Sequence, residues 1–404
     1  MVQKFFALII FLVMIGGSTF AQSNNGEIAG SLHDPQGAVV PGAKITITST
    51  ATGLVRTATT ADNGLFRFPA LPAGIYNLSA EKTGFAVAKI ESIEVLVDET
   101  ATADVALALA QSTNTVTVES GVTMTDTETA HLGGVIGESQ VTTLPLNGRN
   151  FAQLALLNAG VSASGGGGGQ QGGEGGISGY SSNGQRSTSN NFMVDGIDNN
   201  NYEAGSVAQL PSIDSIQEFQ VQTNNYAAEY GRSSGSIVNL ITKSGTNQLH
   251  GSAYEFLRNN DLDARNFFAD PAFTAPELRL NQFGATLGGP IQKDKTFFFG
   301  NYEGFRQIAG ITNLTNVPTD AERTGLFFNP ATGQNVQVAV NPVSAQLFSL
   351  FPEPNTTESG GNYVSSPNLT NSTNQYMLKM DHHLSNGLLT ARYSFTGATI
   401  FYPF

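Results

Sequence analysis

The chain has 404 residues and a formal net charge of −13, with 13% charged residues, 45 glycines and no cysteine. The acidic balance argues against nucleic acid as a partner, because neutralising phosphates requires a basic face. The lack of cysteine excludes disulfides, zinc–thiolate sites, iron–sulfur clusters and cysteine nucleophiles. Low charge with abundant glycine, serine, threonine and asparagine favours short strands and turns over helical bundles, so we predict a mainly β chain.

Residues 1–21 have the pattern of a signal peptide. Lys4 gives a positive start, residues 5–15 form an apolar run, and Thr19 and Ala21 are small residues where a signal peptidase cleaves. The run is too short for a permanent membrane helix, although an uncleaved anchor is the alternative. No run of about 18 apolar residues follows it, so any further membrane crossing must use a β-barrel. We therefore predict an exported protein.

Residues 26–110 alternate apolar and polar side chains between turn signals. Phe66 and Phe68 share one face of a predicted strand, and Arg67 points away from it. The same alternation occurs in three further sets: Ile45 and Ile47; Tyr76, Leu78 and Ala80; Val105, Leu107 and Leu109. Period-two alternation with turns about every ten residues predicts an antiparallel β-sandwich.

The turns of this segment occur in the order of a known family. The matching residues are Gly30, Asp34, Gly37, Pro41-Gly42-Ala43, Thr60 to Phe68, Leu71 to Tyr76, and Gly84-Phe85. They resemble the carboxypeptidase-regulatory-like domain, a small transthyretin-like β-sandwich grouped with carbohydrate-binding-like folds. The resemblance implies no peptidase chemistry. A generic immunoglobulin-like sandwich with the same strands is the alternative.

A short extended stretch follows in a linker at residues 111–121. It consists of Thr115, Val116, Thr117, Val118 and Glu119, which alternate polar and apolar side chains. A strand with free edges can add to a sheet of another protein by β-augmentation. The alternative is an ordinary linker or the last strand of the sandwich.

Residues 122–245 contain an ordered series of motifs. The stretch 144–161 predicts a turn and a short helix that ends at Gly160, and the glycine-dominated tract 164–179 is expected to be a loop. The motif residues that we single out are Asn147, Gly148, Arg149, Asp195, Gly196, Tyr230, Gly231, Thr242 and Lys243. The series also includes the stretches 213–221 and 234–245, and the second combines a glycine-rich turn, an apolar strand and a closing Thr-Lys-Ser-Gly.

This series resembles the plug domain of TonB-dependent receptors and transporters, in particular the Oar-like branch. The resemblance implies an α+β plug in a barrel lumen and an outer-membrane location, with sandwich and plug on the periplasmic side. It also implies that Thr115 to Glu119 form a TonB box, which binds a TonB-type inner-membrane energy-coupling protein. The implied function is uptake of an unidentified substrate, with a carbohydrate or a peptide among the candidates, and no cofactor.

Residues 246–404 are typical of transmembrane β-strands. Alternating stretches of roughly ten residues occur at 250–258, 280–289, 295–306, 375–383 and 388–395, with turns expected at 290–294 and 385–387. The insert 308–373 is expected to be an extracellular loop with a short helix at 343–351. These strands would contact outer-membrane lipid. Barrels of this class close with about 22 strands, so we expect the chain to be the N-terminal fragment of a longer receptor.

The sequence offers little that is typical of an enzyme. His382 and His383 are adjacent and would face opposite sides of a strand, which is poor metal geometry. Asp195 and Asp198 with the asparagines 199–201 could ligate calcium, but turns stabilised by these side chains are the simpler interpretation. We predict that the chain is not an enzyme and has no metal site. The alternative function is a surface carbohydrate-binding or adhesion protein that uses the sandwich.

Overall fold

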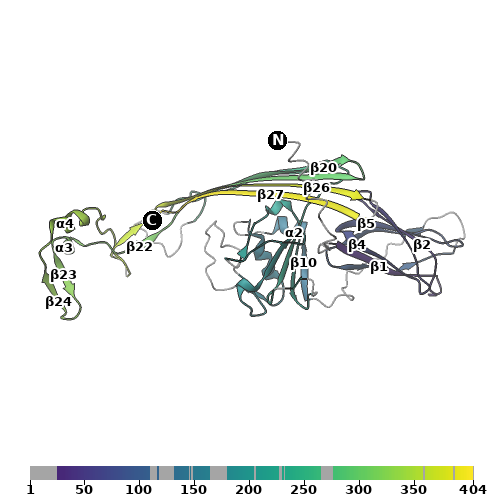
Figure 1. The fold of residues 1–404 in the computed structure, drawn as a ribbon, viewed down its shortest axis with the longest axis horizontal. Coiled ribbons are helices and arrows are strands. Elements are labelled where there is room, and N and C mark those ends of the chain that lie inside the picture. Colours follow the sequence, from purple (N-terminus) through teal and green to yellow (C-terminus); the bar gives the residue numbers. More distant parts are fainter. Residues whose placement is uncertain are drawn as a thin grey trace, which may run out of the picture. The chain divides into compact units, whose positions relative to one another are not determined.

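The computed structural model shows a mainly β protein, as predicted (Figure 1). It describes residues 25–109, 116–117, 132–144, 146, 149–163, 180–203, 206–226, 230–231, 233–264, 276–357, 360–384 and 387–403. The predicted signal peptide, the glycine-dominated tract and Phe404 lie outside these residues. Two compact units are distinguished, the first comprising 1–252, 285–302 and 375–395, and the second 253–284, 303–374 and 396–404. Within the described residues, no helix is long and apolar enough to cross a membrane.

The N-terminal sandwich consists of two sheets. The first has the order β4-β1-β7, and β8 also pairs with β1; the second has the order β3-β2-β5-β6-β9. The strands are β1 (Asn25–His33), β2 (Lys44–Ser49), β3 (Val55–Thr59), β4 (Leu65–Pro72), β5 (Gly74–Glu81), β6 (Ala88–Val95), β7 (Thr100–Thr102), β8 (Val105–Ala106) and β9 (Val116–Thr117). Pairing is antiparallel except that β1 pairs in parallel with β7 and β8, and β6 with β9. The expectation of a purely antiparallel sandwich is therefore wrong at these edges.

The sandwich core follows the predicted alternation. Phe66, Phe68 and Tyr76 are buried in one hydrophobic cluster, together with the isoleucines of β2. Leu109 was expected in the same core and is instead 52% exposed. Regular pairing ends at Ala106 in β8, and Leu109 forms only an isolated bridge with Phe85, so no opposing sheet covers its side chain.

A second group of strands forms the central sheet, with the order β10-β17-β18-β13-β14. Its strands are β10 (Leu132–Gly137), β13 (Asn191–Val194), β14 (Ile197–Asp198), β17 (Ile216–Asn224) and β18 (Ile237–Thr242). Short pairs β11 (Val161–Ala163) with β12 (Tyr180–Ser182), and β15 (Asn200–Asn201) with β16 (Ser206–Val207), accompany it. One face of the sheet is apolar because Phe192, Phe219, Val221, Val238 and Leu240 alternate onto it.

Helical segments cover part of this apolar cluster. The short helix expected within residues 144–161 is a 3₁₀ helix, η2 (Phe151–Leu157), whose first turn is capped by Asn150 Oδ1 accepting from Ala152 N at 2.9 Å. It ends three residues before Gly160, so the predicted C-terminus is wrong. Asn158 has an extended backbone, and Gly160 takes the left-handed φ of 81° in the following turn. The helix α2 (Glu138–Thr143) was not predicted, because its six residues contain one buried apolar side chain, Val141.

A third sheet is built from long strands in the order β19-β20-β21-β26-β27. These are β19 (His250–Asn259), β20 (Leu278–Gln292), β21 (Thr296–Gly310), β26 (Asn368–Leu384) and β27 (Gly387–Phe401). All five predicted strands are present, and all of them are longer than expected, β19 by a single residue. The turn expected at 290–294 is shorter, because β20 continues to Gln292 and Asp294 takes a left-handed φ of 60° in the turn that leads to β21.

The insert between β21 and β26 has its own small elements. They are β22 (Asn313–Thr315), α3 (Asp320–Arg323), β23 (Leu326–Asn329), β24 (Gln334–Gln337), α4 (Pro342–Phe348) and β25 (Tyr363–Ser365). The helix expected at 343–351 is α4, which starts where Asn341 Oδ1 accepts from Val343 N at 2.9 Å. It ends earlier than expected because Phe351 precedes Pro352, and a residue before proline disfavours helical backbone.

Candidate functional site

The hairpin between β13 and β14 presents a carboxylate at the end of the central sheet. The register pairs Val194 with Ile197, which leaves only Asp195 and Gly196 in the loop. Both have left-handed φ values, 49° and 71°. Two-residue hairpins with positive φ at both positions strongly prefer Asp-Gly, so this dipeptide determines the turn. The turn is fixed further by Asp195 N, which donates to Leu240 O at 2.8 Å.

The Asp195 carboxylate binds the end of the neighbouring strand β18. Its Oδ1 accepts a hydrogen bond from Thr242 N at 2.9 Å, and its Oδ2 accepts one from Thr242 Oγ1 at 2.7 Å. Two of the predicted motifs, 47 residues apart in the chain, are thus joined through side chain and backbone. The first member of each, Asp195 and Thr242, makes the contact.

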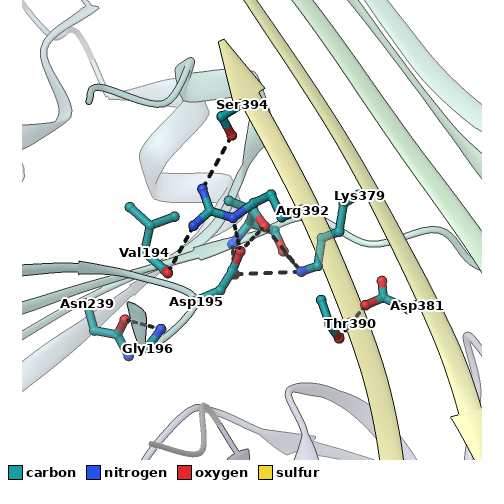
Figure 2. Close-up of polar contacts among 10 residues, drawn as sticks. Val194, Asp195, Gly196, Asn239, Lys379, Asp381, Thr390, Arg392 and Ser394 are labelled. Carbon is teal, nitrogen blue, oxygen red and sulfur yellow. Dashed lines mark hydrogen bonds and ion pairs between the residues drawn. The ribbon is translucent and has the colours of Figure 1, made fainter. Parts of the chain in front are cut away.

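Two cations from the long strands lie against the same carboxylate (Figure 2). Arg392 Nε of β27 is 3.0 Å from Asp195 Oδ2, and Lys379 Nζ of β26 is 3.6 Å from Oδ1. Lys379 also donates to Thr242 O at 3.0 Å and to Thr242 Oγ1 at 3.2 Å, while Arg392 Nη2 donates to Val194 O at 3.2 Å. We call Asp195, Thr242, Lys379 and Arg392 the Asp195 cluster.

The Asp195 cluster is nearly excluded from solvent. The side chains of Lys379, Asp195 and Arg392 are 7%, 12% and 17% exposed. Burying charges is costly unless they are paired and hydrogen-bonded, and these groups have both kinds of partner. A second buried acid, Asp381, lies two residues after Lys379 on β26 and accepts from Thr390 Oγ1 at 2.7 Å (Figure 2).

The inward-facing charges belong to an inverted strand pattern. On β26, Lys379 and Asp381 are buried. Leu378, which precedes Lys379, is 63% exposed, and Met380, which lies between the two charged residues, is 49% exposed. A strand with apolar side chains outward and polar side chains inward is typical of a membrane β-barrel. Lys379 and Arg392 were not identified from sequence. The sequence does carry a signal for both. In each of the stretches 375–383 and 388–395, one basic residue stands between two apolar neighbours, so it faces the side of the strand opposite to them.

The other predicted motif residues have separate partners. The Arg149 guanidinium pairs with the Asp214 carboxylate, and Lys243 Nζ pairs with Glu138 Oε1 at 2.7 Å. The Tyr230 hydroxyl donates to the Asp98 carboxylate, and Gly231 is exposed. Asn147 and Gly148 lie outside the described residues.

The stretch predicted to bind an energy-coupling protein is described only in part. Val116 and Thr117 form β9, which pairs in parallel with β6 opposite Ala88 and Lys89. Thr115, Val118 and Glu119 lie outside the described residues. The backbone places Val116 and Thr117 at the edge of a sandwich sheet, and one edge of β9 is already paired with β6.

The residues weighed as metal ligands make ordinary polar contacts. Asp198 Oδ1 accepts from Asn200 N at 3.0 Å, as expected for a turn held by its side chain. His382 Nδ1 lies 2.8 Å from Thr296 Oγ1, and the ring of His383 packs on Phe297. Across the described part of the chain, no group of three or more His, Cys, Asp or Glu side chains could hold a metal ion.

Two family models match the chain. The carboxypeptidase regulatory-like domain matches residues 27–108, and the outer membrane beta barrel domain matches residues 241–404. The TonB-dependent transporter Oar of Myxococcus xanthus is 30% identical over 305 residues, covering 72% of this chain. The chain is an Oar-like homologue of TonB-dependent transporters. The predicted family, the mainly β fold and the outer-membrane location are confirmed.

This Oar-like chain spans 27% of the length of the Myxococcus transporter. Solved structures that match part of the chain include the outer membrane transporter YddB of Escherichia coli, with 12% identity, a TM-score of 0.43, and coverage of 67% of this chain and 33% of that chain. The siderophore receptor PirA of Acinetobacter baumannii has 18% identity, a TM-score of 0.35, and coverage of 65% and 40%.

Proposed function

We propose that this Oar-like chain supplies the plug and adjoining barrel strands of a TonB-dependent transporter. In this proposal residues 122–245 are the plug, residues 26–110 form a periplasmic sandwich, and residues 115–119 receive a TonB-type energy-coupling protein. The Asp195 cluster is the observation that carries the proposal. It connects the central sheet to β26 and β27 by buried ion pairs, as a plug held inside a polar lumen requires.

The Asp195 cluster is suited to hold a plug until force is applied. Separating the central sheet from β26 and β27 would leave Lys379 and Arg392 without their shared carboxylate. Removing one partner of a buried pair typically costs about 3–5 kcal/mol. Such a cost keeps the closed state dominant at rest, while a pull from the energy-coupling protein can supply it.

The retention role is tested with Asp195→Asn in the full-length transporter. The variant leaves two buried cations facing a neutral amide, so the plug should loosen and the outer membrane should admit vancomycin. The measurement is the growth of cells on vancomycin, normalised to the amount of transporter in the outer membrane. Asp198→Asn is the matched control, because Asp198 lies in the same hairpin but bonds Asn200 and Tyr202 instead. Unchanged vancomycin resistance at normal transporter levels would contradict the retention role.

The coupling role is tested by cysteine crosslinking, for which the cysteine-free chain provides a clean background. Single cysteines at Thr115, Val116, Thr117, Val118 and Glu119 are combined with cysteines in the periplasmic domain of a TonB-type protein. Since β9 already pairs with β6, the partner must use the other edge or displace β6. Crosslinks should exceed those of a control cysteine at Glu91, which is exposed on β6. Unchanged energy-dependent uptake after deletion of residues 115–119 would reject this assignment.

The alternative of a surface carbohydrate-binding protein finds no support in the sandwich. Aromatic rings offer flat apolar faces for ligand contact, but Phe66, Phe68 and Tyr76 are buried in the core and Phe85 packs against it. These are all the aromatic residues within residues 25–109, every one of which the structure describes. Calorimetric titration of the detergent-solubilised chain with a panel of polysaccharides tests the alternative. The expected result is no binding heat with any polysaccharide of the panel.

A further inference from the structure

The strand β17 has two buried faces of different chemistry. Phe219 and Val221 lie in the apolar cluster of the central sheet. Glu218, Gln220 and Gln222 alternate onto the opposite face and are only 4%, 1% and 2% exposed. A polar face of an antiparallel sheet ordinarily meets water, so a structural element must cover this one.

The cover is the turn between β6 and β7 of the sandwich, residues 96–99, which we call the docking turn. All three buried polar residues of the β17 face bind it. The bonds are Val97 N to Glu218 Oε2 (3.2 Å), Gln220 Nε2 to Val97 O (3.1 Å) and Gln222 Nε2 to Asp98 Oδ2 (3.4 Å). The backbone of Val97 and the side chain of Asp98 thus bind three alternate residues of one strand.

The docking turn is shaped for this contact. Asp98 has a left-handed φ of 57°, and its carboxylate also accepts from the Tyr230 hydroxyl. The Val97 side chain is fully buried, although it belongs to none of the hydrophobic clusters formed by the described residues. A hydrophobic side chain at the tip of a turn would be exposed if the sandwich stood alone. Its burial indicates a specific interface.

We propose that the docking turn is a proton-linked latch, which holds the sandwich on the polar face of β17 while Glu218 is protonated and weakens when Glu218 ionises. The proposal concerns contacts within the chain and does not depend on the transport role.

The electrostatic surroundings of Glu218 favour its protonated form. Burial raises the pKa of Glu218 to about 7, the hydrogen bond from Val97 N opposes the rise, and the carboxylates of Glu94 and Glu99 add to it. On the neighbouring strands, the residues opposite Glu218 are Gly137 and Ile241, which do not titrate. The helix α2 also packs on β17 and carries Glu138, whose charge is paired with Lys243.

The hydrogen bonds of the interface also favour the protonated form of Glu218. Among the described residues, Gln220 Oε1 and Gln222 Oε1 are buried acceptors without a donor. An ionised Glu218 carboxylate offers them no donor, because it can only accept hydrogen bonds. Buried acceptors without donors are costly, and a proton on Glu218 adds a donor where one is short.

The sign of the pH dependence follows from linkage. In the docked state the pKa of Glu218 is about 7, against an ordinary value of 4.5 for an exposed carboxyl. Docking is therefore fully favoured below the ordinary value and is weakened as the pH rises through about 7. Linkage predicts that the docking equilibrium constant falls about tenfold between pH 6 and pH 8.

The test measures the distance between the sandwich and the central sheet in the whole chain in detergent micelles. Nitroxide labels are attached to Asp62→Cys and Glu203→Cys, two exposed positions in a chain without native cysteine. Pulsed electron resonance should give one narrow distance distribution at pH 5.5 and a broad second population at pH 8.5. An identical distribution at both pH values would overturn the proposal.

Three variants separate the latch from general effects of pH. Glu218→Gln cannot ionise, so its distribution should stay narrow at both pH values, and a response like that of the unmodified chain would overturn the proposal. Glu91→Gln removes a charge from an exposed position on β6 and should keep the full response. Tyr230→Phe removes the bond to Asp98, so it should lower docking about tenfold at every pH without changing the pH slope.

Hydrogen exchange of the unlabelled chain provides a second readout that needs no substitution. The Val97 amide should exchange slowly at pH 5.5 and lose protection at pH 8.5 after correction for intrinsic rates, because its acceptor is Glu218. Equal protection at the two pH values would count against the latch. Amides of the core strand β2 serve as the internal control and should keep their protection.

Discussion

The N-terminal sandwich and the long-strand sheet use the same alternation with opposite orientation. On β4 of the sandwich, Phe66 and Phe68 are buried and Leu65 is exposed at the strand end. On β26, Lys379 and Asp381 are buried while Leu378 is exposed. Period two is common to both because every strand alternates its side chains. We propose that the surroundings of a strand determine which of its faces is apolar: water surrounds the sandwich, whereas the long strands have lipid outside and a polar interior.

The largest effect is expected from truncating a large side chain in the sandwich core. Phe68→Ala removes a side chain that is 3% exposed and contacts the ring of Phe66. Truncating a buried phenylalanine typically costs 3–5 kcal/mol, so we expect a loss of about 4 kcal/mol in the free energy of unfolding of the sandwich. Urea denaturation monitored by circular dichroism measures it. Leu65→Ala on the same strand is the control and should cost less than about 1 kcal/mol, because Leu65 is 51% exposed. Equal losses would show that the two positions do not differ in burial.

The comparison also shows what the sequence alone could establish. Alternation predicted the buried faces of β2, β4 and β5 and the existence of all five long strands, because period two depends only on the backbone. It could not predict where pairing stops, which is why Leu109 was misplaced and all five long strands were predicted too short. Strand ends depend on partners that are distant in sequence.

The site was accessible to sequence analysis only in part. Asp195, Gly196 and Thr242 were identified as motif residues, and the Asp-Gly preference of a two-residue hairpin explains their position. Lys379 and Arg392 were not identified, because their role depends on meeting Asp195 from strands 184 and 197 residues further along the chain. The docking turn was missed for the same reason. A polar strand face looks like a solvent-exposed face until its cover is known.

The next effect tests the outward face of the long strands. Leu378→Arg places a charge where the inverted pattern expects lipid, and such substitutions cost about 2–4 kcal/mol at the bilayer midplane. We therefore expect about 3 kcal/mol, measured as the folded fraction of the full-length protein in liposomes across a urea series. Leu65→Arg is the matched control on the sandwich, where the same change meets water and should cost less than about 0.5 kcal/mol. If Leu378→Arg were as mild as its control, the outward face of β26 would not contact lipid.

The smallest effect is expected from a variant that changes the backbone of the Asp195 hairpin and keeps its charge. This hairpin connects the central sheet to β26 and β27. Gly196 has a φ of 71°, and alanine is strained in this region, so Gly196→Ala should cost about 1 kcal/mol through the hairpin alone. The Asp195 carboxylate and its bonds to Thr242, Lys379 and Arg392 are retained in this variant. Vancomycin exclusion should therefore stay normal in Gly196→Ala cells while the melting temperature of the transporter falls slightly. If Gly196→Ala admitted vancomycin as readily as Asp195→Asn, the shape of the hairpin, and not its charge, would hold the central sheet against β26 and β27.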